Sequence, residues 1–449
     1  GIHYYTSPNY SHRFYVDGTP AIQDAYVKTS TNGSAAWHTI LVGGLQAGGK
    51  GYYALDVTNP ANFTAGNIDS LLLWEFSSRN DADLGFSYSN PQIALMNNGR
   101  WAAIFGNGYN ATGTDNAKLF IVFLDGGLSG TWTKGTDYLV IDTKSGKATA
   151  NNTPNGLATP ALVDLDGNGT VDRIYAGDLN GNIWAFNVSG SSTSSWGSAY
   201  GTSTTPVPLY TGIATQPITT QPVVAKNPGV SDTGTNSPNV LVMVGTGQFL
   251  GTTDKTNTNT QAFYGVWDSG TSGLTTSNLV QQTFTTSGSN RIMSNTSVPY
   301  TNSGSSQKFG WYIQFTNGER VIFPASVIQA RIGFNQFEAE VLFSTFIPNN
   351  TTACSYGGSG NAMIVKVLNG GQPTAAVIDV NNDSQINTLD NINGSVVSSV
   401  SITGGVPAQP VIRGDYLFIP TSSGTVMKIK ITNTGLPIGR ISWSVIKQN

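Results

Sequence analysis

Short runs of β-branched and aromatic residues recur along the whole chain, and each is bounded by Gly, Asn, Asp or Pro. Clear examples lie at 39–42, 51–57, 119–124, 240–244, 340–344 and 416–420. Apolar residues at the helical spacing of three to four positions are almost absent. Runs of this length and composition are typical of strands. The sequence therefore predicts an all-β fold.

A longer repeat becomes visible when the proline residues that precede apolar runs are aligned. They stand at positions 20, 91, 160, 222, 324 and 410. Several of the following strands end in glycine and continue through a turn into a second strand, as in 174–186 and 417–429. Periods of about 60 to 100 residues are typical of β-propeller blades with loop insertions. Two stacked β-sandwiches would explain the strands but not this repeat, so we expect a propeller of six to eight blades.

The ends and the loops of the repeat suggest one continuous domain. Segments 71–76 and 441–446 are similar, and we expect the second to complete the ring against the first blade. The polar stretches 189–205, 227–238, 268–300 and 349–360 are interpreted as loops rather than linkers. The sequence thus predicts a single propeller domain over residues 1–449.

Composition narrows the class of protein further. The 449 residues include 53 glycines, only 10% are charged, and the formal net charge is −3. A surface with so little positive charge cannot hold a phosphate backbone, which excludes nucleic acid as a main partner. A charge-poor chain rich in Ser, Thr and Asn is typical of exported bacterial proteins, and because it starts at Gly1 we expect a piece of a longer precursor. No apolar run reaches the ~18 residues that a transmembrane segment needs.

Cysteine and histidine are too scarce for several common kinds of site. Cys354 is the single cysteine, so no intrachain disulfide can form, and the three histidines are His3, His12 and His38. A zinc or haem site built from these side chains is therefore not expected. The sequence contains no nucleophile elbow or nucleotide-binding loop, and we expect no enzymatic activity.

The clearest chemical motif is a loop of alternating oxygen-bearing residues. Its candidate ligands are Asp164, Asp166, Asn168, Thr170 through its backbone carbonyl, and Asp172. Calcium takes about six to eight oxygen ligands, and a tightly coiled loop points alternate residues inward to supply them. Gly169 permits the sharp turn, and Val171 can anchor the loop to the core. We predict that this loop binds Ca²⁺; the alternative is a turn of Asp and Asn residues without a metal.

A second loop has a similar pattern over twelve residues. Its candidate ligands are Asp379, Asn381, Asp383, Gln385 through its backbone carbonyl, and Asp390. Ile386 stands at the anchor position, as in EF-hand-like loops. Ser384 replaces the expected glycine, and an aspartate closes the loop instead of the longer glutamate. A nine-residue version closed by Asn387 is an alternative, and we again predict Ca²⁺ rather than an empty loop.

Several long motifs resemble one known family. They are 14–20 together with 41–60, then 177–186, 245–251, 261–268, and 310–313 followed by 318–321. In this order they are similar to the C-terminal domain of PilY/PilC-type pilus tip proteins, over nearly the whole chain. The resemblance implies a modified seven-bladed propeller carried on the type IV pilus machinery at the bacterial surface.

The same resemblance implies a function for the calcium loops. In the family, EF-hand-like loops bind Ca²⁺ and control pilus extension and retraction, and this role maps onto the two loops described above. It further implies roles in pilus biogenesis, surface attachment, twitching motility and virulence. Pilins or minor pilins, and a host-cell surface receptor, are the implied partners.

One family feature is not carried over. The integrin-binding Arg-Gly-Asp of the family, where present, lies near the hairpin after the first loop, but that hairpin here reads Leu-Asn-Gly-Asn-Ile over 179–183. The tripeptide Arg413-Gly414-Asp415 occurs elsewhere, and we interpret it as a plain turn.

Two other functions remain as alternatives. Segment 182–186 is similar to blade-end strands of quinone-dependent dehydrogenases, but a lone Cys354 cannot form the vicinal disulfide usual in those enzymes. A carbohydrate-binding propeller would show aromatic side chains clustered on one open face. The nine tryptophans stand mostly at strand positions and are predicted to belong to the core, with sugar stacking a lesser option.

Overall fold

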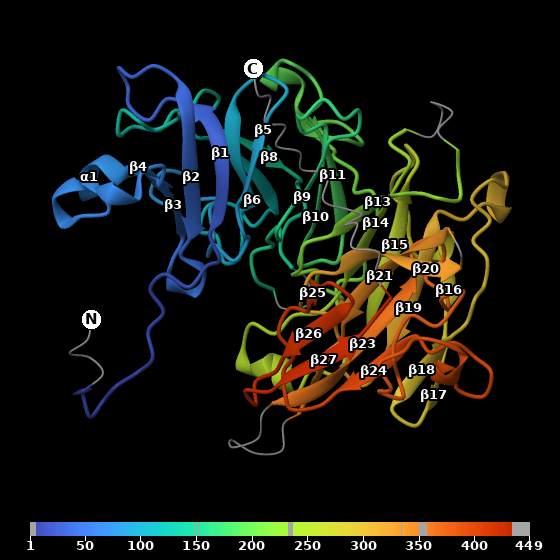
Figure 1. Ribbon diagram of the computed structural model, residues 1–449. Coiled ribbons are helices and arrows are strands. Elements are labelled where there is room, and N and C mark those ends of the chain that lie inside the picture. Colours follow the sequence, from blue (N-terminus) through green and yellow to red (C-terminus); the bar gives the residue numbers. More distant parts are fainter. Residues whose placement is uncertain are drawn as a thin grey trace. The chain divides into compact units, whose positions relative to one another are not determined.

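The computed structural model describes residues 6–148, 150, 152–231, 237–333, 335–349 and 357–432 (Figure 1). Over these residues the regular secondary structure is mostly strand, with a few short 3-10 helices, and the α-helix is the single turn α1 (Ile68–Leu71). The predicted all-β fold is confirmed. The proposed closing strand 441–446, Cys354 and His3 lie outside the described residues.

The chain divides into two compact units. The first contains the described residues within 1–147, 152–159 and 191–193, and the second contains those within 148–151, 160–190 and 194–449. The first unit holds two four-stranded antiparallel sheets. Their strands are β1 (Ala21–Val27), β2 (Ala36–Gly44), β3 (Gly51–Asp56) and β4 (Leu72–Ser77), then β5 (Gln92–Leu95), β6 (Trp101–Gly106), β7 (Lys118–Phe123) and β8 (Tyr138–Asp142).

An aromatic core joins the two sheets of the first unit. Tyr52 from β3 stacks on Phe105 from β6 with ring centroids 3.8 Å apart. Phe76 from β4 meets Phe120 from β7 edge to face at 5.9 Å. All four rings are buried, so one face of each sheet is covered by the other.

The second unit contains four sheets. The first has β9 (Ala161–Val163), β10 (Arg173–Gly177), β11 (Ile183–Asn187) and β12 (Gly197–Ser198). The next has β13 (Val223–Lys226), β14 (Val240–Gly245), β15 (Gln261–Asp268), β19 (Gly310–Phe315) and β16 (Val280–Gln282). The third has β17 (Phe284–Ser287), β18 (Asn290–Met293), β24 (Ser399–Ile402), β23 (Gly358–Lys366), β21 (Gln336–Ser344) and β20 (Ser326–Gly333), with β22 (Ile347–Pro348) beside β23. The last has β25 (Val411–Arg413), β26 (Tyr416–Pro420) and β27 (Val426–Lys430).

The proline repeat marks these sheets. The six prolines at 20, 91, 160, 222, 324 and 410 stand one or two residues before β1, β5, β9, β13, β20 and β25. Proline has no N–H to donate to a neighbouring strand, so it is tolerated where a strand begins. The predicted repeat is therefore present as six sheets over the described residues, whereas a seventh blade stays a prediction.

The interpretation of 268–300 as a loop was wrong in part. This segment contributes β16 to one sheet and the hairpin of β17 and β18 to the next. The polar composition of the segment hid these strands: β17 is an edge strand with two exposed positions, and β18, which pairs with β17 and β24, still carries the polar residues Asn290 and Arg291.

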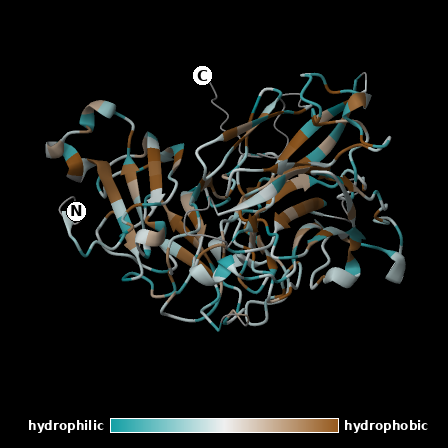
Figure 2. Cartoon of the chain, turned by 90° about the horizontal axis from the view of Figure 1, so that it is seen from below, coloured by the Kyte–Doolittle hydropathy of each residue, from teal (hydrophilic) through white to brown (hydrophobic). Residues whose placement is uncertain are grey.

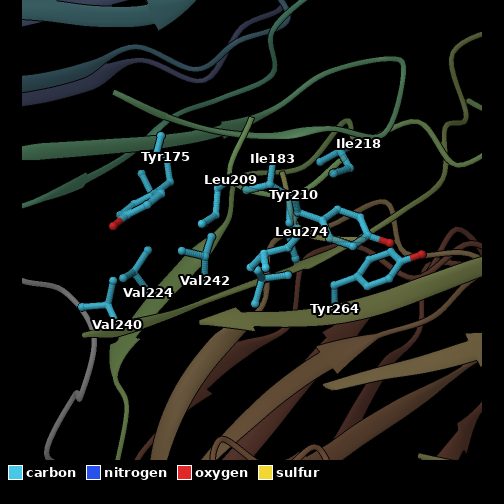
Figure 3. Packing of buried hydrophobic residues seen from close by; sticks show 14 of the residues in the cluster. Tyr175, Ile183, Leu209, Tyr210, Ile218, Val224, Val240, Val242, Tyr264 and Leu274 are labelled. Atoms are coloured by element: carbon cyan, nitrogen blue, oxygen red, sulfur yellow. The ribbon is translucent and has the colours of Figure 1, made fainter. Parts of the chain in front are cut away.

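Apolar residues gather on the strands, and the connecting loops are mostly polar (Figure 2). Figure 3 shows the core that lies between the sheet of β9–β12 and the sheet that begins with β13. In it, Tyr210 packs against Tyr264 with ring centroids 4.8 Å apart, and the Tyr264 hydroxyl donates a hydrogen bond to Gln216. Valine, leucine and isoleucine side chains fill the remaining space.

One carboxyl group is buried beside the hydrophobic core that contains Ile328 and Leu342 in the second unit. Glu340 on β21 is fully buried, opposite Ile328 on β20 and Lys366 on β23. Neither of its carboxylate oxygens has a hydrogen-bond partner within the described chain. Burial, and then the charge of neighbouring Glu338, raises the pKa of Glu340 well above its usual range.

Replacing Glu340 by leucine is expected to stabilise the protein increasingly as the pH rises from 4 to 8. The folded-state pKa is raised, so the wild-type carboxyl weakens folding as the pH climbs from the unfolded pKa through the folded one. Leucine cannot ionise and can pack against Ile328 on the adjacent strand. Urea unfolding at several pH values should show a gap in unfolding free energy that widens to about 1–3 kcal/mol. The exposed strand residue Glu75 supplies the control, Glu75→Leu; a gap that stays constant with pH would contradict the assignment.

Candidate metal centre

The first predicted calcium loop connects β9 to β10. Asp164 directly follows β9, and Asp172 directly precedes β10. The Asp172 N–H donates to the Val163 carbonyl oxygen at 2.9 Å, so the pairing of the two strands brings the ends of the loop together. Gly167 and Gly169 have φ values of +77° and +89°, a conformation that glycine adopts without steric cost. The sequence can therefore coil tightly between these two strands.

Two buried carboxylates organise the loop from its ends. Asp164 Oδ1 accepts hydrogen bonds from the N–H groups of Gly167 and Asn168, at 2.7 and 3.2 Å. Asp164 Oδ2 accepts another from Gly169 at 2.7 Å. Asp172 Oδ2 accepts from Leu165 at 2.8 Å. Each oxygen has more than one acceptor site, so these bonds position the carboxylates and leave them able to bind a cation.

Three carboxylates of this loop converge. One oxygen each of Asp164, Asp166 and Asp172 lies within 4.8 Å of the others. Two oxygens that bind one calcium ion at about 2.3–2.6 Å can be no more than ~5 Å apart, so this spacing fits a shared ion. Without a cation, three carboxylates this close repel one another. The donor set is entirely oxygen, which suits Ca²⁺ rather than zinc.

The remaining predicted ligands of the first loop lie between these carboxylates. Asn168 Nδ2 donates to Asp166 Oδ2 at 3.0 Å, and Asn168 Oδ1 accepts from the Thr170 N–H at 2.7 Å. Val171 is buried, as predicted for an anchor. The roles of Asn168 and Thr170 as ligands stay predictions.

The second predicted loop lies between β23 and β24. The Asp379 N–H donates to the Lys430 carbonyl oxygen at 3.0 Å, which ties the start of the loop to β27. At the other end Asp390 is buried, and its carboxylate accepts from Val380 at 2.8 Å and from Asn387 at 2.9 Å. The Asn387 side-chain oxygen likewise accepts a hydrogen bond, from the Leu389 N–H at 2.7 Å. Both candidates are therefore hydrogen-bonded within the loop, and closure by Asp390, with Asn387 as the alternative, stays a prediction.

One oxygen in the second loop is left without a partner. Asp379 is buried; its Oδ2 accepts from the Ser384 N–H at 2.9 Å, but its Oδ1 has no hydrogen-bond partner among the described residues. A buried carboxylate oxygen without a partner is costly, and a cation would satisfy it. Asn381 and Asp383 are exposed and hydrogen-bond to each other, and Asp383 also accepts from the Gln385 N–H at 2.7 Å.

Several features make the second loop a poorer site than the first. Ser384 takes φ +66°, where glycine would pay no steric cost. The Lys430 ammonium group donates to the Ser384 carbonyl oxygen, so a positive charge already lies beside the loop. Over the part of the chain that the structure describes, the close three-carboxylate grouping occurs in the first loop and not in the second. Lys430 could not be found by sequence reasoning, because it approaches from a strand 46 residues away.

The Arg413-Gly414-Asp415 segment lies at the tip of the hairpin of β25 and β26. Arg413 pairs with Tyr416, which leaves Gly414 and Asp415 as the turn, and Gly414 has φ +57°. All three residues of the tripeptide are exposed. A tight two-residue hairpin explains the glycine without reference to a ligand.

The described residues include no helix long and apolar enough to cross a membrane.

Comparison with known proteins identifies the family. Residues 3–295 match the model of the PilY1 β-propeller domain. A type IV pilus biogenesis factor PilY1 homolog of Xylella fastidiosa is 35% identical over 422 residues, which are 90% of this chain and 26% of the relative. The type IV pilus biogenesis factor PilY1 of Pseudomonas aeruginosa is 32% identical over 419 residues, which are 84% of this chain and 33% of the relative. The chain thus spans a third or less of the length of these two relatives.

The structural comparison agrees. The crystal structure of the Pseudomonas aeruginosa PilY1 C-terminal domain is similar with a TM-score of 0.70 and 29% sequence identity, covering 93% of this chain and 85% of that one. The propeller fold and the family resemblance predicted from the sequence are both confirmed. The chain belongs to the PilY1 β-propeller domain family.

Proposed function

We propose that this chain is the calcium-binding propeller domain of a type IV pilus biogenesis factor. The pilus role is supported by the names of its relatives. The calcium role is supported above all by the convergence of Asp164, Asp166 and Asp172 between β9 and β10. The unpartnered oxygen of Asp379 supports a second, weaker site.

Calcium would act by stabilising the loop and the strands that it joins. Asp172 is followed directly by Arg173, whose Nε lies 3.9 Å from Oδ2 of the fully buried Asp268 on β15. Tyr175, also on β10, donates a hydrogen bond to Asp268 at 2.7 Å. An ion that neutralises the loop carboxylates therefore fixes the start of β10, and through it the contact with the neighbouring sheet. The strength of this effect follows the calcium concentration relative to the Kd.

The biological consequences are part of the same proposal. The domain would be displayed at the cell surface with the pilus, in contact with pilins or minor pilins and with a host-cell receptor. Its calcium state would influence pilus extension and retraction, and hence surface attachment, twitching motility and virulence. It would work by binding rather than by catalysis.

The proposal predicts that Asp164→Ala in the full-length protein, in its own host, removes the response of surface piliation to calcium. In the wild type, chelation of external calcium should change the amount of sheared surface pilin and the diameter of the twitching zone. The variant should match the chelated wild type and ignore added calcium. Asp115→Ala, at a partly exposed aspartate outside both loops, is the control. A variant that responds to calcium like the wild type would contradict the proposal.

A further inference from the structure

One tryptophan in the first unit is conspicuously exposed. Eight of the nine tryptophans fall within the described residues, and Trp37 on β2 is the exposed one among them, at 63%. Its neighbour across the strand pair, Tyr26 on β1, is 53% exposed. Five of the other tryptophans are buried, as the sequence predicts for core residues. Leaving an indole and a phenol in water forfeits a large gain from burial.

These two rings form a cluster with a third. The Tyr26 and Trp37 centroids are 5.7 Å apart at an interplanar angle of 64°. Trp37 also meets Trp101 of β6, at 6.2 Å and 72°. Trp101 is partly buried and packs on the core between the two sheets, so it fixes one side of the cluster. Trp37 therefore lies at a steep angle to both neighbouring rings. Trp101 is held by the core, whereas Tyr26 and Trp37 are open to solvent.

A pair of polar side chains lies beside the cluster on the same sheet face. Asp24 and Thr39 are the next pair along the two strands on the face of Tyr26 and Trp37. The Thr39 hydroxyl donates to Asp24 Oδ1 at 2.7 Å. Asp24 is exposed, and its Oδ2 has no partner among the residues that the structure describes. Two positions along a strand span about 7 Å, so the carboxylate lies roughly one sugar ring away from the aromatic pair.

The size and polarity of this surface select one class of ligand. Full burial of an aromatic side chain removes about 150–250 Å² from water, so three partly covered rings offer far less than the ~800 Å² per partner of a stable protein interface. The apolar surface is interrupted by the Asp24–Thr39 pair before it reaches exposed Ile22, whereas charged residues are depleted in the core of a protein interface. A sugar ring matches this surface, because its apolar C–H face can stack on an aromatic ring and its hydroxyls can donate hydrogen bonds to the Asp24 carboxylate.

We propose that Tyr26, Trp37 and Trp101 form a saccharide-binding platform, with Asp24 accepting hydrogen bonds from sugar hydroxyls. Trp37 supplies the open stacking surface, and Trp101 positions it. The ligand is one or two hexopyranose units of a glycan chain. The aromatic cluster belongs to the first unit and the calcium loops to the second. Saccharide binding can therefore be tested independently of the proposed function.

Calorimetric titration of the purified chain with cellohexaose, chitohexaose and mannohexaose tests the proposal. At least one should bind, and Trp37→Ala should weaken that binding at least ~tenfold, the change that 1.4 kcal/mol produces. Asp24→Asn should weaken it while leaving the rings intact. Phe337→Ala, at another exposed aromatic residue, is the matched control and should bind like the wild type. Far-ultraviolet circular dichroism should show that Trp37→Ala is folded, because an exposed ring contributes little to the core.

Two results would overturn the proposal. The first is that none of the three oligosaccharides binds the wild type, or that Trp37→Ala binds as well as the wild type. The second comes from sedimentation velocity without sugar: a wild-type dimer that Trp37→Ala converts to monomer would assign the cluster to contact with a second copy of the chain instead.

Discussion

Calcium is expected to raise the Tm of the wild-type chain. Asp164→Ala should lose the part of this rise that depends on the first loop. An ion that binds only the folded state stabilises it by about 2.7 kcal/mol at 100 times the Kd. Asp164 is one of the three converging carboxylates, so its removal leaves two charges to hold the ion. Differential scanning calorimetry with calcium and with chelator measures the shift in Tm directly. Equal shifts in wild type and variant would contradict the assignment of this loop.

A second variant separates metal binding from loop structure. Asp164 accepts three backbone hydrogen bonds, whereas the exposed Asp166 contacts only Asn168 in the same loop. Both Asp164→Ala and Asp166→Ala should lose the part of the calcium-dependent shift in Tm that the first loop contributes. Asp164→Ala should lower the Tm in chelator more than Asp166→Ala does, because it removes three backbone hydrogen bonds of the loop rather than one. If Asp166→Ala keeps the full calcium shift, its carboxylate is not a ligand.

Replacing Arg291 by methionine should lower the free energy of unfolding by about 3–5 kcal/mol, as expected when one partner of a buried ion pair is removed. Arg291 and Glu319 are both buried and joined by two hydrogen bonds of 2.8 and 2.7 Å. The guanidinium group also lies over the Phe284 ring, 4.3 Å from its centroid. Without Arg291, the Glu319 carboxylate keeps, among the residues that the structure describes, the 3.3 Å hydrogen bond from Asn361, and its charge remains largely uncompensated.

The double variant Arg291→Met with Glu319→Gln is the control for this loss. It removes the stranded charge, so it should recover most of the stability that the single variant loses. Urea unfolding of the three proteins provides the comparison. A double variant as unstable as Arg291→Met would mean that packing around the arginine, and not the unpaired carboxylate, sets the cost.

Features that depend on neighbouring residues could be predicted from the sequence. A proline before an apolar run marks the start of a strand, so the proline repeat located the sheets correctly. The grouping of carboxylates in the first predicted loop could be anticipated for the same reason, because its aspartates and glycines all belong to one short segment. Its ends at Asp164 and Asp172 coincide with the ends of β9 and β10.

Features that depend on contacts between distant segments could not be predicted. Glu340 and Arg291 look like ordinary polar positions in strands, and only packing shows that both are buried. The unpartnered oxygen of Asp379 and the approach of Lys430 to the second loop also arise from long-range packing. Trp37 is the opposite case, an aromatic residue that the packing of the sheets leaves exposed. Alternation along β2 gives two faces, but the sequence does not say which face the adjacent sheet will cover.

The central claim is that the loop between β9 and β10 binds calcium within a PilY1-type propeller. Isothermal titration of the chelator-treated wild-type chain with Ca²⁺ tests it most directly, with Asp164→Ala and Asp379→Ala titrated alongside. Two ions per chain are expected in the wild type, the tighter one absent from Asp164→Ala and the weaker one absent from Asp379→Ala. A wild-type titration without binding heat at any temperature tried, together with no calcium retained after equilibrium dialysis, would contradict the account.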